Sequence, residues 1–315
     1  MQIVRYNQAY KPVWDNFVSR SRNATFLFYR DYMDYHSDRF EDHSLMFYDR
    51  EQLLGLLPGN LNGDTYYSHE GLTYGGFLLQ AGTTTEQLIE MLRLLTDYLR
   101  SMGLHQLIYK SIPYFYHKTP SEEDLYALYL KKARLISRSL SSTIRCSCLL
   151  PFSHARKDGL RKARKAGLSW YESQDLSVFW TILEQNLWER HHLKPVHSLD
   201  EIQRLHRAFP GQIRLFVVAE TGTVLAGTLV YDTATTAHIQ YISSNHRGKA
   251  VGALDYLFEQ LIFDVFVHKE YIDFGISTDD NGFMLDKGLL FQKEGFGARA
   301  SVYDIYALSF DETDC

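Results

Sequence analysis

The residues between Asn245 and Gly252 could bind an anion. They read NHRGKAVG and follow a strand-like run that ends at Ser244. A helix N-terminus carries unpaired backbone N–H groups and a partial positive charge, and small residues let a ligand oxygen approach the backbone. Arg247 can also pair with a phosphate through two hydrogen bonds. We therefore predict that this loop leads into a helix and holds a phosphate group.

The elements around this loop must position it. Apolar runs predict two strands, at 214–220 and 224–231, joined by a tight turn, and a third strand at 237–243. A helix is expected from about residue 250 to residue 268, and the run YIDFGIS at 271–277 is typical of a further strand. This order places the loop between the third strand and the helix.

The same order of elements recurs in the first half of the chain. Residues 44–59 predict a strand, a turn and a second strand, residues 72–79 a third strand, and residues 86–103 a helix after the loop QAGTTT. We interpret this match as a duplication, and the alternative is one larger α/β domain in which the order recurs by chance. The predicted domains are residues 1–135 and 136–315.

The composition excludes several classes of protein. The chain of 315 residues is 45% hydrophobic and 23% charged, as is typical of a globular protein, and its net charge of -5 argues against a generally basic nucleic-acid binder. Cys146, Cys148 and Cys315 give no disulfide framework. There is no signal-peptide pattern and no apolar run of the roughly 20 residues that cross a bilayer. We expect a cytoplasmic protein without membrane insertion.

Residues 237–298 resemble the GNAT superfamily of N-acyltransferases. The phosphate loop of that superfamily usually reads Gln/Arg-x-x-Gly-x-Gly/Ala; here Arg247 and Gly252 match the outer positions, and Ala250 replaces the first glycine. In the superfamily a strand follows the helix, and a later helix ends in a Gly-Phe pair. The runs YIDFGIST and FQKEGFGA match these two features.

The chain is also similar to the Fem-type peptidyltransferases and related two-domain GNAT proteins. The resemblance covers most of the chain and includes the run YSHEGLTYGG at 67–76. It implies an α/β fold of two tandem GNAT-like domains, each a mixed, mostly antiparallel sheet flanked by helices. The first domain has Gly82 and three threonines at the equivalent loop, but no Arg or Lys. The donor site is therefore expected in the second domain.

This resemblance implies a site for acyl transfer to an amine. GNAT proteins position the acyl carbonyl with the main chain of the strand before the phosphate loop, which corresponds to residues 240–244. The candidate donor-binding residues are Ile242, Ser243, Ser244, Arg247, Gly248, Lys249, Ala250, Val251 and Gly252. The candidate catalytic residues are Lys293, Asp273 and Tyr241.

The roles of individual residues are less well defined. Many coenzyme A-dependent members have a Tyr that protonates the leaving thiolate, but the corresponding residue here, Phe291, cannot donate a proton. Lys293 matches a Lys of the Fem-type enzymes and could hold a phosphate or the developing oxyanion; the alternative is a solvated Lys at a helix end. The amine binds already neutral or loses its proton to a general base. The candidates for that base are Asp273, His238, Glu294 and Asp304.

Two further segments allow more than one interpretation. His191, His192 and His197 suggest a metal site, but adjacent histidines on a helix point about 100° apart, and no i,i+4 partner completes the ligand set. We expect no metal there, and either an acceptor-binding loop or plain surface. The run 154–168 predicts a solvated basic helix, and phosphate contacts with transfer RNA or a nucleotide-linked acceptor are the alternative.

We therefore predict an N-acyltransferase that transfers an acyl group from acyl-coenzyme A, with acetyl-coenzyme A as the first choice. The acceptor is an amine, such as an amino sugar or a cell-envelope precursor. One alternative is a Fem-type aminoacyltransferase that uses aminoacyl-transfer RNA, which Phe291 and Lys293 favour. The other is a non-catalytic binding protein with the same fold.

Overall fold

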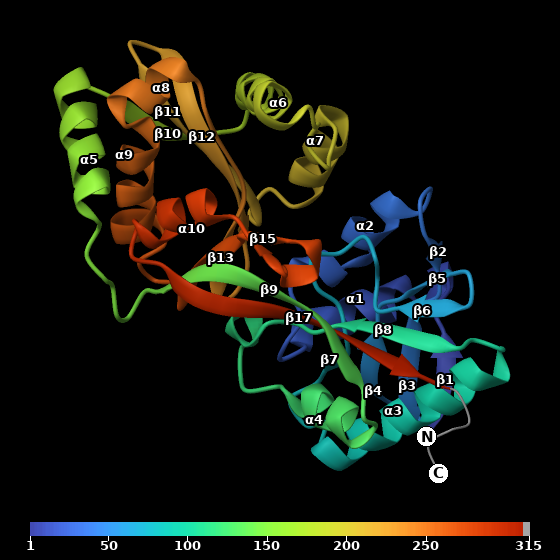
Figure 1. Ribbon diagram of the computed structural model, residues 1–315. Coiled ribbons are helices and arrows are strands. Elements are labelled where there is room, and N and C mark those ends of the chain that lie inside the picture. Colours follow the sequence, from blue (N-terminus) through green and yellow to red (C-terminus); the bar gives the residue numbers. More distant parts are fainter. Residues whose placement is uncertain (311–315) are drawn as a thin grey trace. The chain divides into compact units, whose positions relative to one another are not determined.

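The computed structural model describes residues 1–310, except for the side chains of His36, Arg190 and His191 (Figure 1). Cys315 and the side chain of His191 thus lie outside the described residues. The chain forms two compact units: the first contains residues 1–139, 279–284 and 302–310, and the second contains residues 140–278 and 285–301. The chain crosses between them within four strands: β9 (Arg134–Arg145), β15 (Thr278–Asp279), β16 (Met284–Leu285) and β17 (Arg299–Ser309).

The first unit contains two groups of strands. One is an antiparallel sheet in the order β1 (Gln2–Arg5), β3 (Leu45–Asp49), β4 (Gln52–Leu57) and β7 (Leu78–Leu79). The other has the order β17, β8 (Gln106–Lys110), β6 (Thr65–Tyr67), β5 (Asn60–Asn62) and β2 (Glu41–Asp42). The helices are α1 (Lys11–Arg20), α2 (Arg30–Met33), α3 (Thr85–Ser101) and α4 (Glu123–Leu130). Short 3-10 turns occur at Gln8–Tyr10, Phe26–Phe28, Asp34–His36, Tyr114–Tyr116 and Asp280–Gly282.

Helix α3 shows how the local sequence defines an element. Thr84 and Gln87 form a capping box, in which each side chain accepts a hydrogen bond from the backbone N–H of the other. One face of the helix is apolar, and its side chains are buried in the core of the first unit: Leu88, Met91, Leu92, Leu95 and Leu99. The helix ends before Gly103, whose φ of 77° favours glycine.

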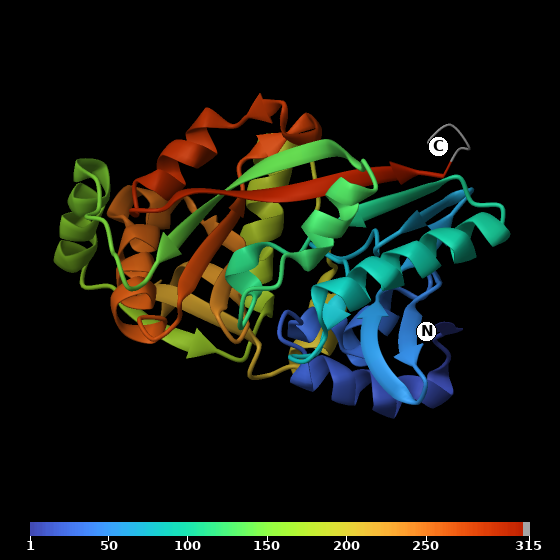
Figure 2. The same ribbon diagram turned by 90° about the horizontal axis from the view of Figure 1, so that it is seen from below.

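The second unit is a mixed sheet with helices on both faces (Figures 1 and 2). The strand order is β10 (Ser169–Ser173), β11 (Ile213–Glu220), β12 (Thr223–Asp232), β13 (Thr236–Ser244), β14 (Tyr271–Ile276) and β9. Only β13 and β14 pair in parallel among these strands. The helices are α5 (His154–Ala166), α6 (Ser177–His191), α7 (Leu199–Ala208), α8 (His246–Val251), α9 (Ala253–Gln260) and α10 (Lys287–Glu294), with a π-helical turn at Leu261–Val265.

The core of the second unit lies between the sheet and helices α5 and α9. Phe216 and Val218 of β11 face Leu257 and Phe258 of α9 in one buried cluster. Alternate residues of the strands face the other side of the sheet, where α6 packs through Phe179 against Gly227. A β-carbon on Gly227 would lie 2.8 Å from the Phe179 ring, so α6 approaches the sheet closely.

The predicted α/β architecture of tandem domains is confirmed, and most element boundaries are close to their predicted places. The third strand of the first half is wrong: residues 72–77 are not a strand, and only Leu78–Leu79 pair with β4. A β-carbon on Gly75 would lie 1.8 Å from the carbonyl oxygen of Ser68, so the chain folds back there instead of extending. In the described part of the chain, no helix is both long enough and apolar enough to cross a bilayer.

The helix predicted at 250–268 is also wrong in detail. Its first turn begins at His246, directly after Asn245, and the helix is interrupted at Gly252, whose φ is 74°. A π-helical turn then replaces the α-helix at Leu261–Val265. The later helix expected before the Gly-Phe pair begins at Lys287 and ends at Glu294.

Candidate functional site

Strands β13 and β14 run together for a short distance and then separate. Their parallel ladder has three residue pairs, of which His238 and Asp273 form the last. Beyond it, β13 continues to Ser244 and pairs with β12 alone. A bulge at Gln240 interrupts the pairing with β12, because Leu229 lies opposite Tyr241 and Val230 lies opposite Ile239. Bulges increase the local twist of a strand, which helps β13 to diverge from β14.

A cleft of about 490 Å³ lies beside the free part of β13. Its residues come from six elements of the second unit. They are Ile242, Ser243 and Ser244 on β13, Gly248, Lys249, Gly252, Ala253, Leu254 and Asp255 on α8 and α9, Leu183, Asn186 and Leu187 on α6, Arg156 on α5, and Leu289 and Gln292 on α10.

Asn186 fixes one wall of the cleft. Its side-chain N–H groups donate to the hydroxyl oxygen of Ser243 at 2.6 Å and to the carbonyl oxygen of Ser244 at 2.8 Å. The ammonium of Lys249 donates in turn to the side-chain oxygen of Asn186 at 2.7 Å. Helix α6 is thereby tied to the end of β13, and a cation is held at the cleft.

The turn from β13 into the helices has two parts. Asn245 caps α8, because its side-chain oxygen accepts a hydrogen bond of 2.8 Å from the N–H of Gly248. Gly252 then ends α8 in a left-handed conformation, and α9 begins without a side-chain cap. The first turn of α9, Ala253 to Asp255, lines the cleft. Its backbone N–H groups and the positive end of the helix dipole suit an anion.

Packing accounts for both glycines of the loop. A β-carbon on Gly248 would lie 2.4 Å from the Ser244 hydroxyl, and one on Gly252 would lie 2.3 Å from the carbonyl oxygen of Gly159. Gly252 therefore allows α5 to pack closely against the start of α9. Approach of a ligand is not needed to explain the small residues at these two positions.

The structure brings six of the predicted donor-binding residues to the cleft and leaves three out of its lining. Those at the cleft are Ile242, Ser243, Ser244, Gly248, Lys249 and Gly252. Val251 is buried in the core, and Ala250 is exposed. Arg247 makes two hydrogen bonds to the carboxylate of Glu220, at 2.8 Å and 2.6 Å. The helical rotation between successive residues turns Arg247 toward β11, while Lys249 lines the cleft.

An ion pair that the sequence did not predict lies in the cleft. The guanidinium of Arg156 donates to Asp255 at 2.7 Å, across the contact of α5 with α9. Burial raises the pKa of Asp255, and the charge of Arg156 opposes that shift. A carboxylate in the first turn of α9 complements the helix dipole. The two residues are 99 positions apart, and no local pattern links them.

Asp273 is fully buried and is held by three donors. Ser141 donates to one carboxylate oxygen at 2.5 Å, and the N–H of Gly275 donates to the same oxygen at 3.1 Å. The other oxygen lies 2.8 Å from Nδ1 of His238. Nδ1 of His238 therefore carries the proton in this contact while Asp273 is ionised, and Nε2 is the basic nitrogen of the ring. Of the other base candidates, Glu294 is exposed, and Asp304 belongs to the first unit, where it pairs with Arg138.

Lys293 is buried, so it is not a solvated lysine at a helix end. Its side chain is 3% exposed, and its ammonium donates to the carbonyl oxygens of Gly275 at 2.8 Å and Ile276 at 2.6 Å. Burial lowers the pKa of Lys293 to about 8, and the charge of Asp273 opposes this shift. Phe291, two residues earlier, is 66% exposed.

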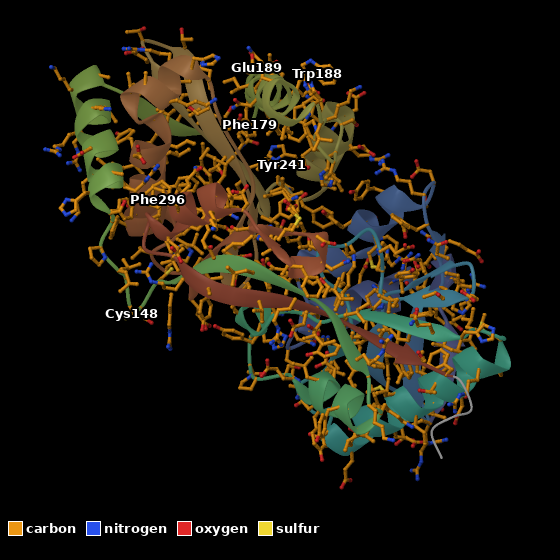
Figure 3. The ribbon with its side chains drawn as sticks, in the orientation of Figure 1. Cys148, Phe179, Trp188, Glu189, Tyr241 and Phe296 are labelled. Carbon is orange, nitrogen blue, oxygen red and sulfur yellow. The ribbon has the colours of Figure 1, made fainter. Side chains whose placement is uncertain are left out.

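Tyr241 lies between β13 and the helices α6 and α7 (Figure 3). Its hydroxyl is 2.7 Å from Nδ1 of His197, and its ring packs edge-on against Trp180 with centroids 5.3 Å apart. Burial raises the pKa of Tyr241, so the phenol keeps its proton at neutral pH. His197 thus contacts a residue of β13. Among the residues that the structure describes, no three His, Cys, Asp or Glu side chains form a group that could hold a metal.

Residues 154–281 match the family model described as "Acetyltransferase (GNAT) domain". The matched segment contains β13 and β14, which separate beside the cleft, and most of the residues that line the cleft. This segment, which is less than half of the chain, is therefore similar to GNAT acetyltransferase domains, in line with the resemblance that the sequence indicated. The chain does not match any curated protein sequence.

Solved structures share the fold over nearly the whole chain. The crystal structure of FemX has 12% sequence identity and a TM-score of 0.66, and the match covers 96% of this chain and 97% of FemX. The C-terminal domain of a putative lysylphosphatidylglycerol synthetase from Agrobacterium fabrum has 11% identity and a TM-score of 0.57, with 95% and 92% covered. A tandem GNAT protein from the clavulanic acid biosynthesis pathway has 12% identity and a TM-score of 0.50, with 99% of each chain covered.

Proposed function

We propose that the protein is an N-acyltransferase whose activated acyl donor binds in the cleft beside β13. The observation that carries this proposal is the position of the cleft: it lies where β13 leaves β14, in the segment that matches a GNAT domain. The free edge of β13 offers main-chain hydrogen bonds to an extended donor, and the first turn of α9 offers N–H groups to its phosphates.

Acyl-coenzyme A is the proposed donor, and acetyl-coenzyme A is the first to test. Lys249 and the start of α9 supply positive charge at the end of β13, where a pyrophosphate would bind. Asp255 is the acidic residue that lines this cleft, and its ion pair with Arg156 offsets its negative charge. The residues present therefore fit a phosphate-bearing donor, with Lys249 in the role that the sequence assigned to Arg247.

His238 is the proposed general base. The amine nitrogen of the acceptor forms a bond to the acyl carbon, the bond from that carbon to sulfur breaks, and the amine proton passes to Nε2 of His238. Asp273 orients the ring through Nδ1 and stabilises the imidazolium that forms. Lys293 supplies a cation beside Asp273 at the end of β14. Tyr241, a neutral phenol on β13, is the proposed proton donor to the leaving thiolate.

The acceptor is an amine, and an amino sugar or a cell-envelope precursor is the proposed class. The similarity to FemX supports this choice through the fold alone. The acceptor must therefore be identified by an activity assay. The cytoplasmic location also remains a prediction from the sequence.

A Fem-type donor, aminoacyl-transfer RNA, is the second candidate. The ion pair of Arg247 with Glu220 favours it, because the Arg of the coenzyme A loop is engaged on the outside of the cleft. Phe291 favours it as well, since no phenol occupies that position. A binding protein without catalysis is the third candidate.

Calorimetry and a turnover assay distinguish these candidates. We expect the protein to bind acetyl-coenzyme A and to release free thiol when supplied with an amine from a panel of amino-sugar nucleotides and peptidoglycan precursors. Failure to bind acetyl-coenzyme A would remove coenzyme A as the donor, and transfer from aminoacyl-transfer RNA to the same panel would then establish the second candidate. Binding of a donor without turnover on any amine would leave the non-catalytic protein.

A further inference from the structure

A second groove, of about 530 Å³, lies beside α5 in the second unit. None of its residues lines the donor cleft. They are Pro151, Phe152, His154, Lys157, Leu160, Arg161, Arg164, Glu259 and Phe263. Helix α5 runs alongside α9 (Figures 1 and 2), and the groove follows one side of this helix pair.

The floor of the groove is apolar and continues onto the surface. Phe152 is buried, and its ring centroid lies 5.6 Å from that of Phe263, which is 48% exposed. Val267, which follows the end of the π-helical turn, is 50% exposed, and Leu150, next to Pro151 in the sequence, is 36% exposed. Exposed apolar side chains gathered at one place mark an interaction surface more often than scattered ones do.

A row of cations follows α5, and its first two members, Lys157 and Arg161, line the groove. Lys157, Arg161 and Lys165 follow one another at i, i+4 and i+8 on α5, and therefore share one face of the helix. In the described part of the chain, the side chains of Lys157 and Lys165 form no ion pair and no hydrogen bond. Among the residues that the structure describes, Arg161 pairs with the exposed Asp158 on its own helix and with no other acid.

The acidic residues near the groove do not balance the positive charge of this row of cations. Glu259 is bound by Arg164, which makes hydrogen bonds of 2.8 Å and 3.0 Å to its carboxylate. Asp158 pairs with Arg161 on α5, and Asp264, next to Phe263, is exposed. The local charge is thus positive, although the whole chain carries a net charge of -5.

We propose that this surface, defined by Leu150, Lys157, Arg161, Lys165, Phe263 and Val267, docks the protein on an anionic phospholipid bilayer. The cations contact lipid phosphates, and the apolar side chains enter the boundary between headgroups and acyl chains. A single-stranded RNA would also use the cations and could stack a base on Phe263. It would leave Leu150 and Val267 without a role, and these two residues therefore favour the lipid. The inference goes beyond the proposed acyltransferase function and does not rest on it.

Vesicle sedimentation with the full chain tests this inference. We expect at least tenfold stronger partition onto vesicles of phosphatidylglycerol and phosphatidylcholine in equal amounts than onto phosphatidylcholine alone. The triple variant Lys157→Glu, Arg161→Glu, Lys165→Glu is expected to lose at least tenfold in partition. The matched control, Arg207→Glu, Lys194→Glu, Lys287→Glu, makes the same charge change at exposed sites elsewhere in the second unit, and is expected to stay within twofold of the wild type.

The apolar contribution needs its own variant. Phe263→Ser with Val267→Ser is expected to lower partition at least threefold in 0.5 M salt, an order-of-magnitude value for conditions in which the charges are screened. Equal partition onto both kinds of vesicle, or equal losses in the two triple variants, would overturn the proposal. So would tight binding of a single-stranded RNA that depends on Lys157 and is unaffected by anionic vesicles. Circular dichroism of each variant excludes unfolding as the cause of a loss.

Discussion

His238 and Asp273 face each other across the last rung of the parallel ladder between β13 and β14, with Nδ1 of the imidazole 2.8 Å from the carboxylate. The pair thus sits where the two strands begin to separate. Asp273 is fully buried, and three donors surround its carboxylate. A buried carboxylate without such partners would be costly, so the ladder and the hydrogen bonds support each other.

The substitution Asp273→Asn tests the general base. It removes the charge that stabilises the imidazolium and keeps the size of the side chain. We expect kcat/KM for acyl transfer to fall by about 100-fold or more, within the usual contribution of general-base catalysis. Donor affinity, measured by calorimetry, is expected to remain within twofold. The control is Glu294→Gln, which changes an exposed carboxylate; an equal loss in both variants would exclude the proposed role of Asp273.

The burial of Lys293 predicts how the free energy of unfolding depends on pH. Its pKa is about 8 in the folded chain, below the value of about 10.4 that a lysine has when unfolded. Between these values the unfolded chain binds more protons, so this residue makes the free energy of unfolding rise with pH, by at most about 1.4 kcal/mol per pH unit. Below pH 8 the contribution is constant, because Lys293 is protonated in both states.

Urea unfolding of the wild type and of Lys293→Met at pH 7, 8, 9 and 10 measures this effect. The wild type is expected to gain stability relative to the variant above pH 8, because other titrating groups cancel in the comparison. Lys287→Met, at an exposed position of the same helix, should run parallel to the wild type. Parallel curves for Lys293→Met would contradict the assigned burial. If the cation is needed for transfer, activity falls as the pH rises through 8.

The donor cleft predicts that Lys249, and not Arg247, contributes to donor binding. Lys249 lines the cleft, whereas Arg247 pairs with Glu220 outside its lining. We expect Lys249→Ala to weaken acetyl-coenzyme A binding about tenfold, equivalent to about 1.4 kcal/mol. Arg247→Ala is expected to change the Kd less than twofold. Calorimetric titration of both variants tests this prediction. A larger loss of affinity for Arg247→Ala than for Lys249→Ala would show that Arg247 contributes more to donor binding.

Gly159→Ala tests the close contact of α5 with α9. The new β-carbon would lie 1.8 Å from a carboxylate oxygen of Asp255, so the Arg156–Asp255 pair or the helices must move. Alanine in a helix normally stabilises by roughly 0.5–1 kcal/mol over glycine. We expect the clash to dominate and to cost about 1–3 kcal/mol in urea unfolding. Gly211→Ala, where a β-carbon would meet nothing within 4 Å, is the control and is expected to change stability little.

Local patterns were sufficient to predict much of the fold. The apolar runs predicted β11, β12 and β13, and the run at 86–103 predicted α3, because these signals depend on neighbouring residues. The prediction of a third strand in the first half was wrong because contacts between residues distant in the sequence determine the backbone there. Gly76 has a φ of 91°, and a β-carbon there would lie 2.5 Å from the hydroxyl of Tyr109, so tertiary contacts decide the path of the chain.

The candidate site could be predicted only in part. The loop and its strand were recognised because they are contiguous, and His238 and Asp273 were each considered as bases. Their direct contact depends on the ladder register, which the sequence alone does not specify. Asn186 and Arg156 reach the cleft from other helices through packing, and neither has a local signal. Gly252 was assigned to ligand approach because its contact with Gly159 spans distant parts of the chain.

The return of β17 to the first unit affects any attempt to divide the chain. Residues 305–309 pair with residues 106–110 of β8. An isolated fragment ending at residue 139 would keep β8 but lack this partner, and its exposed backbone edge would invite pairing between molecules and aggregation. Co-expression with a peptide carrying the β17 sequence would cover that edge. We therefore expect a fragment that ends at residue 139 to need the β17 segment to complete its sheet.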